Sequence, residues 1–247
     1  MINMATEPVI EIEGLKKSFG EKTVLNGMSL CVKKGENVVI LGKSGTGKSV
    51  TIKCIAGLLT QDEGSIKVFG EEVKNMNEEQ LKALRNRIGF LFQSAALYDS
   101  MTVRENLAFP LKRVAQLRDK DQIESMCIEV LQAVGLEDAI DKMPADLSGG
   151  MRKRMGLART LILKPEIILY DEPTTGLDTI TSKEISKLIL DMQERYQTSA
   201  VIITHDMRCA KITSDNVMVM NDGRCIAEGK YEELENSNDQ FIQSFFK

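Results

Sequence analysis

Short apolar runs that alternate with helical patterns organise the chain. Residues 37–41, 88–92, 167–170 and 199–204 are continuous apolar, often β-branched runs, which is typical of strands buried on both faces of a sheet. Helical patterns precede or separate these runs, for example the charged segment 78–87. Because strands alternate with helices, the pattern predicts an α/β fold with a parallel sheet at its core.

The N-terminal part carries a different pattern. Residues 9–13 alternate between apolar and polar side chains, the alternation breaks over residues 16–21, and a strand-like pattern resumes over residues 24–32. This predicts an antiparallel β segment ahead of the core. Near the other end, residues 216–220 and 224–227 flank Asn-Asp-Gly, a hairpin signal, and the tail after them is predicted to be helical.

Residues 94–163 show helical periodicity without core strands. Apolar side chains recur at i, i+3 and i+4 over residues 123–134, which predicts an amphipathic helix with one buried stripe. A shorter helix is expected over residues 103–111, stopped near Pro110. A third is expected to begin at Ser148 and to run to about residue 163. The chain is therefore predicted to be a parallel α/β core with a helical insertion.

Composition places the chain among ordinary globular proteins, with 43% hydrophobic and 28% charged residues. A formal net charge of −4 argues against general affinity for nucleic acid or anionic lipid. The five cysteines lack C-x-x-C spacing and are expected to be small buried side chains. Residues 1–14 lack a signal pattern and no apolar run is long enough to span a bilayer, so we expect a soluble chain.

Residues 42–49 match the phosphate-binding pattern G-x-x-x-x-G-K-[ST] at every fixed position. They stand between a predicted strand and a predicted helix, the context in which backbone N–H groups face a polyphosphate. Lys48 adds a full charge for the β- and γ-phosphates, and the Ser49 hydroxyl can ligate Mg²⁺. The residues expected to hold the nucleotide are Gly42, Lys43, Ser44, Gly45, Thr46, Gly47, Lys48 and Ser49, together with Thr51 in the following helix.

Two carboxylates end the strand over residues 167–170. Asp171 can hold Mg²⁺ directly or through water, and Glu172 is the candidate to polarise an attacking water. Adjacent strand residues point to opposite faces, so both can serve only where the chain leaves the strand, and Pro173 fits such an exit. The alternative is a solvated strand end.

Two other strand ends carry polar candidates. His205, the only histidine, follows the strand over residues 199–204 and can hydrogen-bond a γ-phosphate and report its loss. Gln93 follows residues 88–92 and can bridge Mg²⁺ and water. Each is weak evidence by itself, because a lone histidine is more often structural.

Two features lie outside the phosphate loop. Phe19, at the break in the first β segment, can stack on adenine, although ordinary core packing explains it equally well. Ser148, Gly149 and Gly150 form a second helix start suited to an anion, but no lysine follows as in residues 42–49. The alternative is a capped helix behind a flexible turn.

Taken together, these motifs resemble the nucleotide-binding subunit of an ABC transporter. The set comprises residues 42–49, Gln93, residues 147–151, residues 167–172, Thr175-Gly176-Leu177-Asp178 and His205, in family order and spacing. The resemblance implies a single P-loop NTPase domain. Residues 1–93 and 164–247 would form its RecA-like core with an N-terminal antiparallel β subdomain, and residues 94–163 an inserted helical subdomain.

The resemblance also implies roles. Phe19 stacks on adenine, Gln93 senses the metal and water, and ATP and Mg²⁺ are bound. Ser148, Gly149 and Gly150 contact ATP held by the other subunit of a head-to-tail homodimer, whose interface Asp178 lines. ATP binding closes the dimer, and hydrolysis reopens it to drive transmembrane permease subunits. The chain would then lie on the cytoplasmic side of the inner membrane, attached through the permease.

Within that family, residues 91–106 and the form Leu-Ser-Gly-Gly-Met resemble the Mla/Mce-type phospholipid transport ATPases of bacterial envelopes and plastids. The partners implied are a permease contacted by residues 94–110, an Mce-domain lipid-binding protein and a small accessory subunit. Two positions depart from many relatives, which have Gln at position 151 and Tyr at position 19. Met151 removes a polar group near the nucleotide, and Phe19 keeps the ring without the hydroxyl.

Other functions stay open. The chain could serve another ABC importer or exporter, or be a soluble ABC ATPase in assembly or nucleic-acid processes, although it lacks the second cassette or long insertions common there. It could also be a regulator with little turnover, against which Glu172 and His205 argue. The apolar tail over residues 241–246 is expected to pack on its own domain rather than on a neighbouring subunit.

Overall fold

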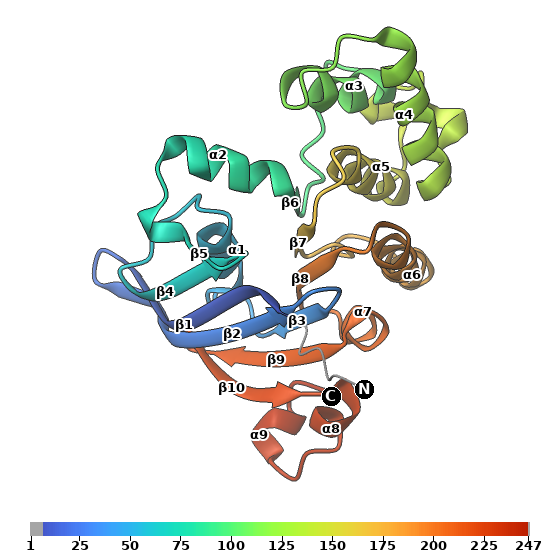
Figure 1. The fold of residues 1–247 in the computed structure, drawn as a ribbon. Helices are drawn as coiled ribbons and strands as arrows, with labels where there is room; N and C mark the ends of the chain where they lie inside the picture. Colours follow the sequence, from blue (N-terminus) through green and yellow to red (C-terminus); the bar gives the residue numbers. More distant parts are fainter. Residues whose placement is uncertain (1–6, 247) are drawn as a thin grey trace, which may run out of the picture.

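The computed structural model describes residues 7–246, which form two sheets surrounded by helices (Figure 1). One sheet is antiparallel and has the strand order β2-β1-β4-β5. Its strands are β1 (Pro8–Phe19), β2 (Lys22–Lys33), β4 (Glu63–Val68) and β5 (Glu71–Glu72). The predicted N-terminal antiparallel segment is therefore present.

The second sheet has the order β10-β9-β3-β8-β7-β6 and is parallel except for the β9–β10 hairpin at its edge. Its strands are β3 (Asn37–Leu41), β6 (Ile88–Leu91), β7 (Ile167–Asp171), β8 (Ser199–Thr204), β9 (Asn216–Asn221) and β10 (Arg224–Gly229). The predicted parallel core is confirmed, and the strands predicted from apolar runs lie next to one another in it.

Nine α-helices are assigned within the described residues. They are α1 (Lys48–Ile55), α2 (Glu78–Arg87), α3 (Val103–Arg113), α4 (Lys120–Val134), α5 (Gly149–Leu161), α6 (Thr179–Tyr196), α7 (Met207–Thr213), α8 (Tyr231–Glu235) and α9 (Gln240–Gln243). In Figure 1, α3 and α4 lie at the end of the molecule away from β9 and β10, and α5 lies between them and α6. Within residues 7–246, none of the helices has the length and apolar character needed to cross a membrane.

The core explains why the parallel strands are apolar throughout. In β3, Val39 and Leu41 join one hydrophobic cluster with helices α3 to α6, whereas Val38 and Ile40 join a second cluster with the antiparallel sheet and α1. The same division separates alternate residues of β7 and β8. Since both faces of the sheet are covered, every position of these strands favours an apolar side chain.

Several predicted boundaries were wrong. Strand β1 does not end before residue 16: it continues to Phe19 through several irregularities in register, which absorb the polar break in the pattern. Pro110 lies inside α3, which continues to Arg113, because tertiary packing overrides the local preference. The tail contains two short helices, α8 and α9, rather than one.

Three smaller expectations have clear outcomes. The tail packs on its own domain, with Phe246 edge-on to Tyr231 at 5.2 Å between ring centroids. Cys54, Cys127 and Cys209 are buried as expected, but Cys31 is exposed on β2. The prediction that the chain begins without a targeting signal partly concerns residues 1–6, which lie outside the described residues.

Candidate functional site

The parallel sheet brings the predicted chemical groups to one edge. Strand β3 ends beside β8, with Leu41 opposite Thr204, and β8 continues beside β7, with Ile203 opposite Asp171. Strand β6 lies beside β7 with Leu91 opposite Tyr170. The segments that follow these four strands therefore leave from the same edge, where ligands bind in open α/β sheets.

At two positions, the phosphate loop lies so close to its neighbours that only glycine fits. Gly47 has φ 101°, and a Cβ there would lie 2.7 Å from Leu25 Cδ2 and 2.8 Å from the Val24 carbonyl oxygen. A Cβ on Gly42 would lie 2.6 Å from the Met220 carbonyl oxygen. The loop is thus wedged between β2 and β9, so its backbone has a fixed path into α1.

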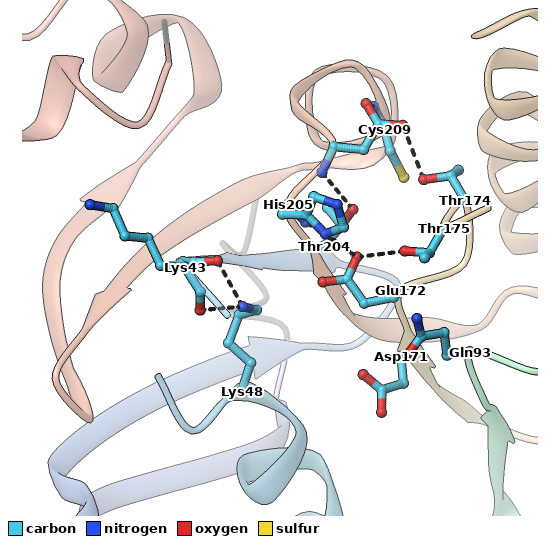
Figure 2. A network of polar contacts seen from close by, with 12 residues as sticks. Lys43, Lys48, Gln93, Asp171, Glu172, Thr174, Thr175, Thr204, His205 and Cys209 are labelled. Atoms are coloured by element: carbon cyan, nitrogen blue, oxygen red, sulfur yellow. Dashed lines mark hydrogen bonds and ion pairs between the residues drawn. The ribbon is translucent and has the colours of Figure 1, made fainter. Parts of the chain in front are cut away.

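Lys48 reaches back across the loop. Its ammonium donates to the carbonyl oxygens of Gly42 at 2.7 Å and Lys43 at 2.9 Å (Figure 2). Burial lowers the pKa of Lys48, while the charges of Glu172 and Asp171 act in the opposite direction. The ammonium is therefore held at the mouth of the loop, where a polyphosphate would meet it.

Ser49 and Asp171 form the part of the site suited to a cation. The Ser49 hydroxyl donates to Asp171 Oδ1 at 3.0 Å, and both residues line the same cavity as Gln93. Hydroxyl, carboxylate and amide oxygens are the hard ligands that Mg²⁺ prefers, so this set of donors fits magnesium. Within the described residues there is no cluster of three or more His, Cys, Asp or Glu side chains that could hold a different kind of metal centre.

Glu172 faces the cavity because the backbone turns at that residue. Its φ is 54°, in the left-handed region, and its N–H still donates to the Ile203 carbonyl oxygen at 2.9 Å. Such a conformation costs a side-chain-bearing residue about 1 kcal/mol or more. The chain therefore leaves β7 at Glu172, one residue before Pro173, and both consecutive carboxylates can line the cavity.

His205 contacts Glu172 directly. Its Nδ1 lies 2.8 Å from Glu172 Oε2, and the Thr175 hydroxyl donates to the same carboxylate oxygen at 3.2 Å (Figure 2). The segments that follow β7 and β8 are joined by a hydrogen bond of 3.0 Å from the Thr174 hydroxyl to the Asp206 carboxylate. The carboxylate and the imidazole are thus held as a pair, with Nε2 on the opposite side of the ring from Glu172.

These groups surround one cavity of about 620 Å³. Figure 2 shows Lys48 on one side of this region and Asp171, Glu172 and Gln93 on the other. The cavity is lined by Phe19, Lys22, Val24, Lys43, Ser44, Gly45, Gly47, Lys48, Ser49, Val50, Gln93, Asp171, Glu172, Thr175 and His205. Phe19 is 48% exposed at its rim, which disfavours the alternative that it packs in the core.

Three residues predicted to hold the nucleotide, two in the phosphate loop and one in the following helix, do not line the cavity. Gly42 and Thr46 support the loop from behind, and the Thr46 hydroxyl donates to the Lys43 carbonyl oxygen at 2.9 Å. Thr51 is a correction: its side chain is fully buried and its hydroxyl donates to the Gly47 carbonyl oxygen at 3.3 Å. Thr51 therefore stabilises the first turn of α1 instead of facing the nucleotide.

The second helix start lies elsewhere. Ser148 caps α5 by accepting from the Met151 N–H at 3.3 Å, and neither it nor its two glycines line the cavity. A Cβ on Gly150 would lie 2.7 Å from Thr181 Cγ2, so this turn packs against the start of α6. Asp178 caps that helix, accepting from the Ile180 and Thr181 N–H groups.

Sequence reasoning missed Lys153. Lys153 is buried and donates to backbone carbonyl oxygens at the edge of the cavity. Lys22, Val24 and Thr175 were also missed as cavity residues. The antiparallel sheet brings Lys22 and Val24 to the phosphate loop through a contact that no local sequence signal encodes.

Comparison with known proteins agrees with the resemblance to ABC transporter subunits that the sequence motifs indicated. Residues 25–175 match the profile of the family described as "ABC transporter". The chain is 39% identical over 236 residues to the "Probable ribonucleotide transport ATP-binding protein mkl" of Mycobacterium leprae, covering 96% of this chain and 68% of that protein. It is 36% identical over 257 residues to "Protein TRIGALACTOSYLDIACYLGLYCEROL 3, chloroplastic" of Arabidopsis thaliana, covering 97% and 74%.

A solved structure agrees in fold. The ATP-binding cassette MJ0796, in a dimeric post-hydrolysis state bound to ADP and Pi, superposes with a TM-score of 0.80 at 30% identity over 90% of this chain and 98% of that one. The family profile covers more than half of the chain and includes the phosphate loop, α5 and the β7 carboxylates. The chain therefore belongs to the ABC transporter family and has its ATPase fold.

Proposed function

We propose that this chain binds and hydrolyses ATP in a head-to-tail homodimer and thereby powers a membrane permease. One observation carries the proposal. A complete phosphate cradle, cation site and water-activating pair share one cavity, while the second anion-binding helix start lies outside it. A second copy of the chain is the simplest source of a nucleotide for that surplus site.

The chain's own residues divide the work of binding. The backbone N–H groups of residues 43–49 and the start of α1 face the phosphates, and Lys48 leaves its two carbonyl acceptors to pair with them. Phe19 covers the base by stacking. Ser49, Asp171 and Gln93 would hold Mg²⁺, which neutralises charge on the β- and γ-phosphates when it is bound.

Glu172 and His205 supply the groups for hydrolysis. The Glu172 carboxylate accepts a hydrogen bond from the attacking water and orients it toward the γ-phosphate. His205 holds that carboxylate through Nδ1, which leaves Nε2 to contact the γ-phosphate. Since the same carboxylate is also fixed by Thr175, its orientation is set before the nucleotide binds.

Two observations support the proposed dimer, one from this structure and one from a related protein. The turn at Ser148, Gly149 and Gly150 packs against residues 177–181, so Asp178 lies beside it on one surface. The related cassette MJ0796 is a dimer with ADP and Pi. We propose that this surface meets the phosphate loop of a second copy, with residues 94–163 acting as the helical subdomain that positions it.

The permease contact is proposed on the same helical part, on the cytoplasmic side of the inner membrane. Arg104 and Glu105 are poor probes of it, because Arg104 pairs with Glu124 and Asp141 and Glu105 accepts from the Thr102 N–H. Tyr98 is a better probe of the permease contact, because it is 44% exposed. Co-purification with a multispanning subunit from detergent supports this contact, and a stable assembly without one argues against it.

Phospholipid is the proposed cargo. The support is the likeness of residues 91–106 to Mla/Mce-type ATPases and the lipid name of the Arabidopsis relative, whereas the mycobacterial relative is named for ribonucleotide transport. An Mce-domain protein and a small accessory subunit are the further partners proposed. Lipid extracted from the purified complex and identified by mass spectrometry tests this, and a complex free of lipid that binds ribonucleotide as cargo would contradict it.

The decisive experiment is Glu172→Gln. The amide keeps an oxygen for His205 and Thr175 but is a poor base, so kcat for ATP hydrolysis is expected to fall about 10²–10⁴-fold. With ATP and Mg²⁺ the variant should persist as a dimer in size-exclusion chromatography. Glu166→Gln, at the other end of β7, is the matched control and should turn over normally. Turnover at the wild-type rate by Glu172→Gln would remove the general base assignment.

A further inference from the structure

Lys153 is a buried charge that neither the nucleotide cradle nor the water-activating pair explains. It lies in α5 four residues after Gly149, so the two share a face of the helix. Its side chain is only 6% exposed. A buried lysine is costly unless its ammonium has good partners, so those partners indicate what holds it there.

The partners of the ammonium are two main-chain oxygens at the edge of the nucleotide cavity. Lys153 Nζ donates to the Gln93 carbonyl oxygen at 2.6 Å and to the Glu172 carbonyl oxygen at 3.2 Å. These residues follow β6 and β7, which are adjacent parallel strands. One side chain from α5 therefore clamps together the backbones of two residues proposed to act on water and metal.

The same helix holds the loop after Gln93 at a second point. Arg159 donates to the Ala95 carbonyl oxygen at 3.2 Å, and burial lowers the pKa of this guanidinium. Ala95 and Ala96 have φ values of 60° and 47°, which residues with a Cβ seldom adopt. A loop strained in this way is held by its surroundings, here by two cations of α5.

Charge adds to the mechanical link. Burial lowers the pKa of Lys153, and the negative charges of Glu172 and Asp171 oppose that shift. The attraction between the ammonium and the two carboxylates therefore helps to hold Lys153 at the edge of the cavity. Neither carboxylate lies within 4 Å of it as an ion pair, and the contact to Glu172 is through its carbonyl oxygen.

We propose that Lys153 is a positioning residue that couples helix α5 to the catalytic carboxylate, by fixing the backbones of Gln93 and Glu172. A shift of α5 moves both carbonyl oxygens and with them the Glu172 side chain. This inference rests on the proposed function. In the proposed dimer α5 begins at the partner's nucleotide, so Lys153 makes hydrolysis in one site respond to occupancy of the other.

Three substitutions separate the hydrogen bonds from the charge. Lys153→Met removes both, whereas Lys153→Gln keeps an NH₂ donor on a side chain one bond shorter and loses the charge. Lys187→Met, on the exposed face of α6, is the matched control. Each protein is assayed for ATP affinity, for kcat, and for amide hydrogen exchange of residues 93–98 without nucleotide.

The expected results differ between the variants. Lys153→Met should bind ATP within about threefold of wild type but lose kcat on the order of 10²-fold, because misplacement of a catalytic group by about 1 Å has that effect. Its residues 93–98 should exchange faster. Lys153→Gln should recover part of kcat, because its NH₂ group can still donate to the carbonyl oxygens, although from a side chain one bond shorter than lysine.

Unchanged kcat and unchanged exchange in Lys153→Met would overturn the inference. Should that variant fail to fold, a Lys153→Gln protein whose kcat and exchange of residues 93–98 both match wild type overturns the inference. The exchange measurement needs no turnover. Failure of the proposed function, seen as a wild type without ATPase activity, is therefore distinguishable from failure of the Lys153 link.

Discussion

Two helices of this chain begin in turns made for anions, and they differ in what surrounds them. Helix α1 follows the loop wedged between β2 and β9, opens onto a cavity and carries Lys48. Helix α5 is capped by Ser148, which lies outside that cavity, and its own buried lysine, Lys153, donates to a carbonyl oxygen at the cavity edge.

Under the proposed function, the difference gives one type of motif two tasks. The start of α1 is built into the sheet, so it can bind a nucleotide within a single chain. The start of α5 offers N–H groups without an enclosing wall, which suits a ligand delivered by another molecule. Local sequence is similar in the two places, and the surrounding structure decides which of them forms a site alone.

The largest effect is expected at the start of α1. Lys48→Ala removes the buried ammonium, and hydrogen bonds to charged groups contribute about 1.5–3 kcal/mol each, so ATP affinity should fall on the order of 10²-fold. Equilibrium titration with a fluorescent ATP analogue measures this. Lys187→Ala should leave affinity unchanged, and a Lys48→Ala protein with affinity within threefold of wild type would show that the cradle works without its charge.

A smaller effect is expected at the start of α5. In the Glu172→Gln background, Ser148→Ala should weaken the ATP-dependent dimer roughly tenfold, in line with about 1.5 kcal/mol for a lost hydrogen bond from its hydroxyl to the partner's phosphate. ATP affinity of the monomer should not change, because Ser148 lies outside the cavity. Analytical ultracentrifugation gives the dimer constant.

Thr102→Ala controls for the loss of a cap as such, since Thr102 caps α3 in the same way, accepting from the Glu105 N–H. It should lower stability without affecting the dimer. Equal weakening of the dimer by both variants would indicate a general loss of helix stability and would remove the special role of the α5 start.

The smallest effect is expected at Phe19, on the rim of the nucleotide cavity. Phe19→Ala should reduce ATP affinity about fivefold, the low end for base–aromatic stacking, because the ring is half exposed. Phe19→Tyr should preserve affinity, since it keeps the ring. Phe241→Ala, which removes a ring of nearly equal exposure on α9, is the control. Discrimination between ATP and an abasic triphosphate analogue that survives in Phe19→Ala would count against stacking.

Much of the site could be predicted from sequence because its groups sit at strand ends. The apolar runs predicted β3, β7 and β8, and a parallel sheet necessarily gathers the residues that follow them. Thr51 could not be assigned in this way. It lies in the helix next to the phosphate loop, and only the packing of α1 shows that its hydroxyl returns to Gly47.

What the sequence by itself determined is the set of local chemistries: a phosphate loop, two carboxylates, a histidine and a second helix start. The tertiary structure alone decided how they join. Glu172 and His205 meet because a left-handed residue ends β7 beside β8, and Lys153 reaches Gln93 because α5 packs across β6. Local patterns encode elements, whereas contacts between residues far apart in the chain depend on how those elements pack.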